Sequence, residues 1–164
     1  MTAKDAILQS LGAGEMITQR YLNDLDDGDL VLQPVEGMNP IAWHLGHLVS
    51  SERSMVEAIK PGSSPPLPEG FDAAHSKESS LANDHSGFLP TKAEYLELTR
   101  SQRAATKAVL EGLSEADLDA PSPERLRGMW PTIGAVFMLM GSHTLMHVGQ
   151  YIAVRKKLHK PVAI

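Results

Sequence analysis

Apolar residues recur along most of the chain at intervals of three to four, the spacing that places them on one face of an α-helix. In the first such segment they are Ile7, Leu8, Leu11, Ile17, Tyr21 and Leu25. The apolar–polar alternation that is typical of a β-strand is nowhere sustained over six residues. The pattern therefore predicts four long helices, at about residues 2–25, 40–59, 91–110 and 131–158.

Helix start signals support these boundaries. Thr2 with Asp5, and Thr91 with Glu94, have the spacing of a capping box, in which two side chains satisfy the free N–H groups of the first turn. The segment Ser114–Leu118 has the composition of one further short helical turn. The first and third helices are therefore predicted to begin directly after Thr2 and Thr91.

The second helix and the segment after it carry different signals. Asn39 is the expected N-cap and Pro40 the expected first helical residue. Residues 60–90 contain five Pro and little periodicity, which predicts a long loop, and loops of this length are usually functional or mobile. Four helices, one long crossover and no strand signal predict an all-α bundle.

Two segments, residues 37–51 and residues 128–154, contain no Asp, Glu, Lys or Arg. Surface helices rarely extend so far without charge, so both segments are predicted to be buried. The longer one has the length of a membrane span, but its two His and its Gln are unfavourable in lipid, which favours a central bundle helix. Met residues are predicted to fill the core: Met16, Met38, Met55, Met129, Met138, Met140 and Met146.

Length, cysteine content and charge narrow the functional classes. The chain has 164 residues, the length of one domain, taken here as residues 1–164. It has no Cys, which excludes disulfides, thiolate metal sites and cysteine nucleophiles. Its net charge of −5 argues against general nucleic-acid binding, which needs clustered basic residues. The first residues lack the apolar run of a signal peptide, so we expect a cytoplasmic protein with no nucleic-acid or membrane partner.

Four of the seven His lie in the two uncharged segments: His44, His47, His143 and His147. His143 and His147 are four residues apart and therefore share a helix face, as in helices that present two imidazoles to one metal ion. His44 and His47 also share a face, and their spacing does not choose between them as a third ligand. Three neutral imidazoles suit Zn, Ni or Fe(II), whereas the absence of neighbouring carboxylates argues against Ca or Mg.

The other three His are weaker candidates. His75 and His85 lie in the predicted long loop, and His159 lies in the basic segment at the end of the fourth helix. Each is expected to be an ordinary surface His, although the two in the loop could approach the mouth of a pocket.

Two segments of the chain have a recognisable combined pattern. Residues 39–48 read Asn-Pro-Ile-Ala-Trp-His-Leu-Gly-His-Leu, and residues 143–150 read His-Thr-Leu-Met-His-Val-Gly-Gln. Together they resemble the DinB-like superfamily, and the order of the helices, the long crossover and the late helix with two His extend the resemblance over nearly the whole chain.

The resemblance implies a four-helix up-up-down-down bundle with a long crossover loop, often a homodimer, with a three-His metal site. Matched motif by motif, the implied ligands are His47, His143 and His147. His44 would then contact a ligand rather than the metal. Gln150 and Tyr151, three and four residues after His147, are further candidates for contacts that orient a ligand.

Several functions are compatible with this pattern. Some members of the superfamily are metal-dependent S-transferases that join low-molecular-weight thiols to electrophiles. The segment around Trp43 is also similar to the iron-binding domain of ergothioneine-synthesising sulfoxide synthases, whose second large catalytic domain does not fit within 164 residues. The chain is therefore interpreted as a metalloenzyme with a small-molecule substrate, most concretely a thiol S-transferase. The alternatives are a non-catalytic metal-binding, structural or stress-related bundle protein, and a metal-free bundle whose His are held by hydrogen bonds.

Overall fold

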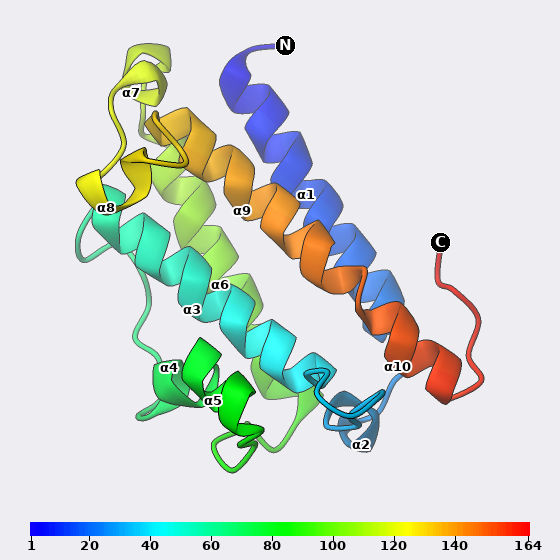
Figure 1. The fold of residues 1–164 in the computed structure, drawn as a ribbon. Coiled ribbons are helices and arrows are strands. Elements are labelled where there is room, and N and C mark those ends of the chain that lie inside the picture. Colours follow the sequence, from blue (N-terminus) through cyan, green and yellow to red (C-terminus); the bar gives the residue numbers. More distant parts are fainter.

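A computed structural model describes all residues, 1–164, as a bundle of long helices with shorter helices at its ends (Figure 1). The four long helices are α1 (Ala3–Leu22), α3 (Ile41–Ile59), α6 (Lys92–Glu111) and α9 (Ile133–Val148). The short ones are α2 (Asp27–Leu30), α4 (Phe71–Ala74), α5 (Lys77–Ala82), α7 (Glu115–Asp119), α8 (Glu124–Arg127) and α10 (Tyr151–Lys157). No β-strand is present, which confirms the predicted all-α bundle.

The directions of the long helices differ from the expected up-up-down-down order. α1 and α9 run parallel, since Ser10 faces Gly141 and Gly14 faces Thr144 one turn later. α3 and α6 also run parallel to each other, in the opposite direction (Figure 1). The order is therefore up-down-down-up. The physical reason is that the chain has one long crossover: residues 60–91 return it to the end of the bundle where α3 began, so that α6 repeats the direction of α3.

The predicted helix starts are largely confirmed. Complete capping boxes form at Thr2 and Thr91, and a third forms at Ser114 before the predicted short turn. The start of α3 is shifted by one residue, because Pro40 occupies the N-cap position without a side-chain hydrogen bond. The Asn39 side chain instead donates to Ser80 Oγ at 2.8 Å and so attaches the crossover to the start of α3.

The crossover segment, residues 60–90, is more ordered than a loop, since it contains α4 and α5. The prediction of a surface position for His75 is wrong: its side chain is only 1% exposed. His75 Nδ1–H donates to the Phe71 carbonyl at 2.8 Å, and the Tyr95 hydroxyl donates to His75 Nε2 at 2.9 Å. The ring lies directly against Gly46 of α3, where a Cβ atom would overlap it. The missing side chain of Gly46 therefore makes the space that His75 fills.

The predicted fourth helix is interrupted between α9 and α10, and it is not fully buried. Met55 and Met140 are core residues as predicted, whereas Met129 is 75% and Met146 is 60% exposed. Met16 and Met138 are also exposed. Met138 and Met146 are exposed because α9 packs against α1, α3 and α7 but leaves one of its faces uncovered. No helix combines the length and the apolar character that crossing a membrane requires.

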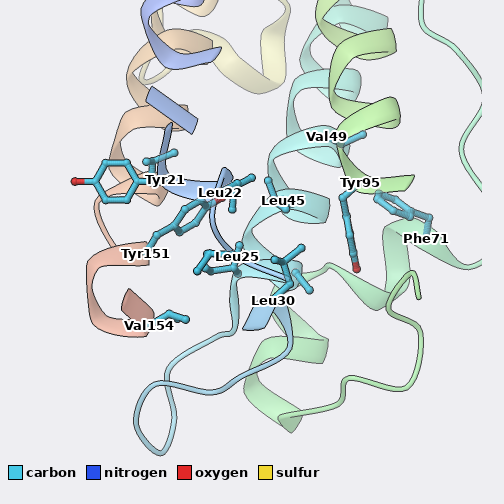
Figure 2. Packing of buried hydrophobic residues seen from close by; sticks show 13 residues of the cluster. Tyr21, Leu22, Leu25, Leu30, Leu45, Val49, Phe71, Tyr95, Tyr151 and Val154 are labelled. Atoms are coloured by element: carbon cyan, nitrogen blue, oxygen red, sulfur yellow. The ribbon is translucent and has the colours of Figure 1, made fainter. Parts of the chain in front are cut away.

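The apolar core is divided into two clusters along the bundle axis. Figure 2 shows the cluster at the end where α3 begins, in which Tyr151, Leu22 and Leu45 meet. The second cluster, at the other end, includes Leu11 and Phe137. Between the two clusters, α3, α6 and α9 contribute buried polar residues: His44, Glu52, Gln102, Arg103, Thr106, Thr144 and His147. Of the predicted metal ligands, His147 belongs to this polar layer, whereas His47 and His143 are half-buried.

Candidate metal centre

The His cluster forms where α3 crosses α9. His47 comes from α3, and His143 and His147 come from α9. Each of the three side chains offers one ligand atom, and these atoms all lie within 4.8 Å of one another. The expectation that a His of the second long helix meets the pair on the fourth is therefore confirmed, and the cluster could hold a metal ion.

His147 is the central member of this group. Its Nε2 lies 2.9 Å from Nε2 of His143, and its Nδ1 lies 2.8 Å from Nδ1 of His44. His44 is almost completely buried behind it, at 2% exposure. The two His of α3 therefore differ in position: His47 belongs to the cluster, whereas His44 lies deeper in the core and contacts His147. Spacing alone could not make this distinction.

The orientation of His47 is determined by the crossover and by a neighbouring aromatic ring. Its Nδ1–H donates to the backbone carbonyl of His75 at 3.3 Å, which leaves Nε2 to accept, and Ser51 Oγ lies 3.3 Å from Nε2. The Trp43 ring stacks on the imidazole with centroids 4.6 Å apart and an interplanar angle of 8°. Trp43 is itself held by a hydrogen bond from Nε1 to the Ser76 carbonyl at 3.1 Å. These contacts fix both the ring position and its tautomer.

Burial makes the imidazoles weak bases. Loss of solvent, together with the neighbouring imidazoles, lowers the pKa of His143 to about 4 and that of His147 to about 3. Burial similarly lowers the pKa of His44 to about 4. The pKa of His47 is lowered for the same reason. The cluster is therefore neutral near pH 7, the state in which an imidazole nitrogen can bind a metal ion.

The donor set agrees with a transition metal. It consists of nitrogen atoms from neutral rings, which suit Zn, Ni or Fe(II). The nearest buried carboxylate, Glu52, accepts hydrogen bonds from Arg103 and Thr106 and is engaged elsewhere. The residues present therefore fit a three-His site with room for an exogenous ligand.

A broad pocket of about 1030 Å³ lies beside the cluster. His47 and His143 form part of its wall, and the pocket is bounded by α3, the crossover, α8 and α9. Its volume is at the upper end of the range for small-molecule sites. A molecule in this pocket would lie directly against two of the three imidazoles.

The remaining candidates lie outside the cluster. Tyr151 is fully buried, its ring lies 5.9 Å from that of His44, and its hydroxyl has no hydrogen-bond partner. Gln150 is exposed at the start of α10 and makes no side-chain hydrogen bond there. His85 is half-buried and stacks on Phe88, and His159 is exposed.

Sequence reasoning assigned Trp43 and Ser51 no part in this centre. Of His75 it predicted only a possible approach to the mouth of a pocket, which the structure shows, and not the contact of its carbonyl with His47. Ser51 lies four residues after His47, so helical periodicity places it on the same face. The contribution of His75 is made through its backbone carbonyl, which carries no residue-specific signal. Gly46 was the available clue, because a Gly inside a helix often marks a close approach by another segment.

A family model described as the DinB superfamily matches residues 11–151, a range that contains the whole His cluster. No curated protein and no solved structure matches the chain significantly.

Proposed function

The chain belongs to the DinB superfamily, and from this premise we propose that it is a metal-dependent enzyme whose His47, His143 and His147 hold one divalent transition-metal ion. The observation that carries the proposal is the convergence of three neutral imidazoles within 4.8 Å, beside a pocket of substrate size. A bound divalent ion supplies a positive charge that lowers the pKa of a thiol or a water molecule.

The hydrogen bonds around the cluster define the part that each residue plays. His47 donates Nδ1–H to the His75 carbonyl, so its Nε2 lone pair is free. If His147 also uses Nε2 as a ligand, its Nδ1 carries the proton and donates to Nδ1 of His44. His44 then acts as a positioning residue, because it fixes the tautomer and the ring orientation of His147.

The proposed reaction is the transfer of a low-molecular-weight thiol to an electrophile. The thiol sulfur forms a bond to the electrophilic carbon, the thiol proton passes to solvent, and the leaving group departs with its bonding electron pair. The chain has no Cys, so the reacting sulfur belongs to the substrate. The pocket beside His47 and His143 holds the substrate.

Metal content and thiol consumption test this function together. The protein is purified without a His tag, reconstituted with Zn, Ni or Fe(II), and its metal is quantified. Glutathione, bacillithiol and mycothiol are then supplied with a generic electrophile. One ion per chain and metal-dependent loss of a thiol would support the proposal. No retained metal would overturn it, and metal without turnover would indicate a binding protein.

We further propose that the protein is a homodimer that pairs through the uncovered face of α9. The exposed side chains on this face are Met138, Ser142, Leu145 and Met146, and the segment carries no charge. An uncharged apolar face can pair with its own copy across a two-fold axis without burying a charge. Light scattering should report a dimer at micromolar concentration, and Leu145→Glu should convert it to a monomer. A monomeric parent protein would refute this.

A further inference from the structure

The pocket beside the His cluster has a positively charged lining, although the protein as a whole is negatively charged. Three cationic side chains from three different elements line it: Arg53 of α3, Lys77 of α5 and Arg125 of α8. The chain as a whole carries a net charge of −5. Basic residues are thus gathered at the one pocket that also contains His47 and His143.

Most hydrogen-bonding groups of these cations are free of protein partners. Arg53 donates only its Nε–H, to the Pro65 carbonyl at 3.2 Å. Arg125 uses a single terminal nitrogen, which donates to the carbonyl and to the hydroxyl of Ser54. The Lys77 ammonium makes neither a hydrogen bond nor an ion pair with the chain. Guanidinium groups that keep unpaired N–H donors are suited to bind a carboxylate through two parallel hydrogen bonds.

Two acidic residues also line the pocket, and they offset only part of its positive charge. Glu57 accepts hydrogen bonds from the backbone N–H groups of Gly62 and Ser64, both at 2.7 Å, which directs its carboxylate at the crossover. Asp72 is exposed on α4. With three cations and two acids, the lining keeps a positive surplus. The lining also has an apolar part, which consists of Met129, Trp130, Leu139 and Met146.

We propose that this pocket binds an anionic substrate through a carboxylate group, with Arg53 and Arg125 as the hydrogen-bond donors and Lys77 as an additional cation at the rim. The apolar wall then packs against the uncharged part of the same molecule. This inference rests on the proposed function, because it places the substrate beside the His cluster. Such a pocket would bind thiols that carry a carboxylate more tightly than uncharged thiols.

The test uses a matched pair of probes that carry no free thiol: S-methylglutathione and its dimethyl ester, in which both carboxylates are blocked. Binding is measured by calorimetry on the metal-loaded protein and on the metal-free protein. The acid should bind at least about tenfold more tightly than the ester, and more weakly as salt is raised. Arg125→Gln and Lys77→Gln should each reduce this preference several-fold.

Control variants distinguish the effect of a cation in the pocket from the effect of the protein's overall charge. Arg20→Gln and Lys156→Gln remove exposed cations outside the pocket and should leave the preference unchanged. Arg125 also joins α8 to α3, whereas Lys77 has no contact to lose, so the Lys77 variant remains informative if the Arg125 variant is unstable. Equal binding of acid and ester by the parent protein would overturn the inference, as would equal losses in the pocket and control variants.

The same samples distinguish this inference from the proposed function. Each is assayed for bound metal, which the pocket variants should retain. Selective binding of the acid by a protein that never retains metal would leave the anion pocket standing and refute the metalloenzyme. One ion per chain without selectivity would refute the anion pocket alone.

Discussion

Two groups of polar side chains lie in and beside the buried polar layer, and they have opposite chemistry. The first is the His cluster, and the second is the ion pair between Glu52 and Arg103, with their closest N and O atoms 2.8 Å apart. Arg103 also donates to Thr144 at 3.2 Å, and the Thr106 hydroxyl donates to Glu52 at 2.6 Å. The ion pair is buried, whereas His47 and His143 are half-buried. The two groups are adjacent, since Thr144 is next in sequence to His143.

The difference lies in how each group compensates for burial. Burial raises the pKa of Glu52, but the Arg103 guanidinium and two hydrogen bonds favour the charged carboxylate. Opposite charges therefore satisfy each other within the chain. The imidazoles are alike, so none can neutralise another, and they remain uncharged, with ring nitrogens that contact one another instead of an opposite charge. The charges of the ion pair balance each other within the chain, whereas the His cluster is completed by a cation.

The largest effect should follow from His47→Ala. We expect metal affinity to fall by a factor of about 1000 or more, because a site with two imidazoles replaces one with three. Metal titration followed by elemental analysis measures this. His159→Ala, at an exposed position, is the control and should bind metal normally. If His44→Ala loses the ion and His47→Ala retains it, the assignment of the third ligand is reversed.

Breaking the ion pair should affect stability instead of metal binding. Arg103→Met leaves Glu52 buried without its partner and should lower the free energy of unfolding by about 3–5 kcal/mol. Urea denaturation measures this loss, while the metal content should remain at one ion per chain. The double variant Glu52→Leu with Arg103→Met should recover most of the stability, because it leaves no unpaired charge. Loss of metal from folded Arg103→Met would show that the two groups are not independent.

His44→Ala should have an intermediate effect. His44 contacts His147 but lies outside the cluster, so its removal should weaken metal affinity by about 10–100-fold. Rescue by His44→Gln, whose amide can accept the hydrogen bond from Nδ1–H of His147, would distinguish positioning from packing. An unchanged affinity in His44→Ala would remove this residue from the centre.

The smallest effect concerns the stability of the metal-free protein at acid pH. Burial holds the folded pKa of His143 and His147 at about 4 and 3, below the ordinary value of 6.5. Their contribution is therefore complete above pH 6.5 and is lost as the pH falls toward 4. After allowance for partial exposure, each imidazole should contribute about 1 kcal/mol to this loss. Urea denaturation between pH 7 and 5 should show a shallower pH dependence for His143→Gln than for the parent.

The features that the sequence predicted correctly, the helix starts and the pairing of His143 with His147, depend on residues that are close in sequence. Capping boxes connect residues three apart, and His143 and His147 share a face because they are four apart. The position of Arg103 depends on Glu52, which is 51 residues away, and local periodicity does not report such a pairing. The prediction that Met146 is buried was wrong because it relied on the absence of charged residues in this segment, and that absence does not show which face of α9 another helix covers.

The hydrogen bond from His47 to the His75 carbonyl connects the candidate metal centre to the crossover. Local opening of residues 71–76 would remove this acceptor and release the His47 ring, so the open form should bind metal more weakly. By mass action, a metal that prefers the closed form must suppress its opening. Amide hydrogen exchange in α4 should therefore slow when metal is added, although α4 contributes no ligand.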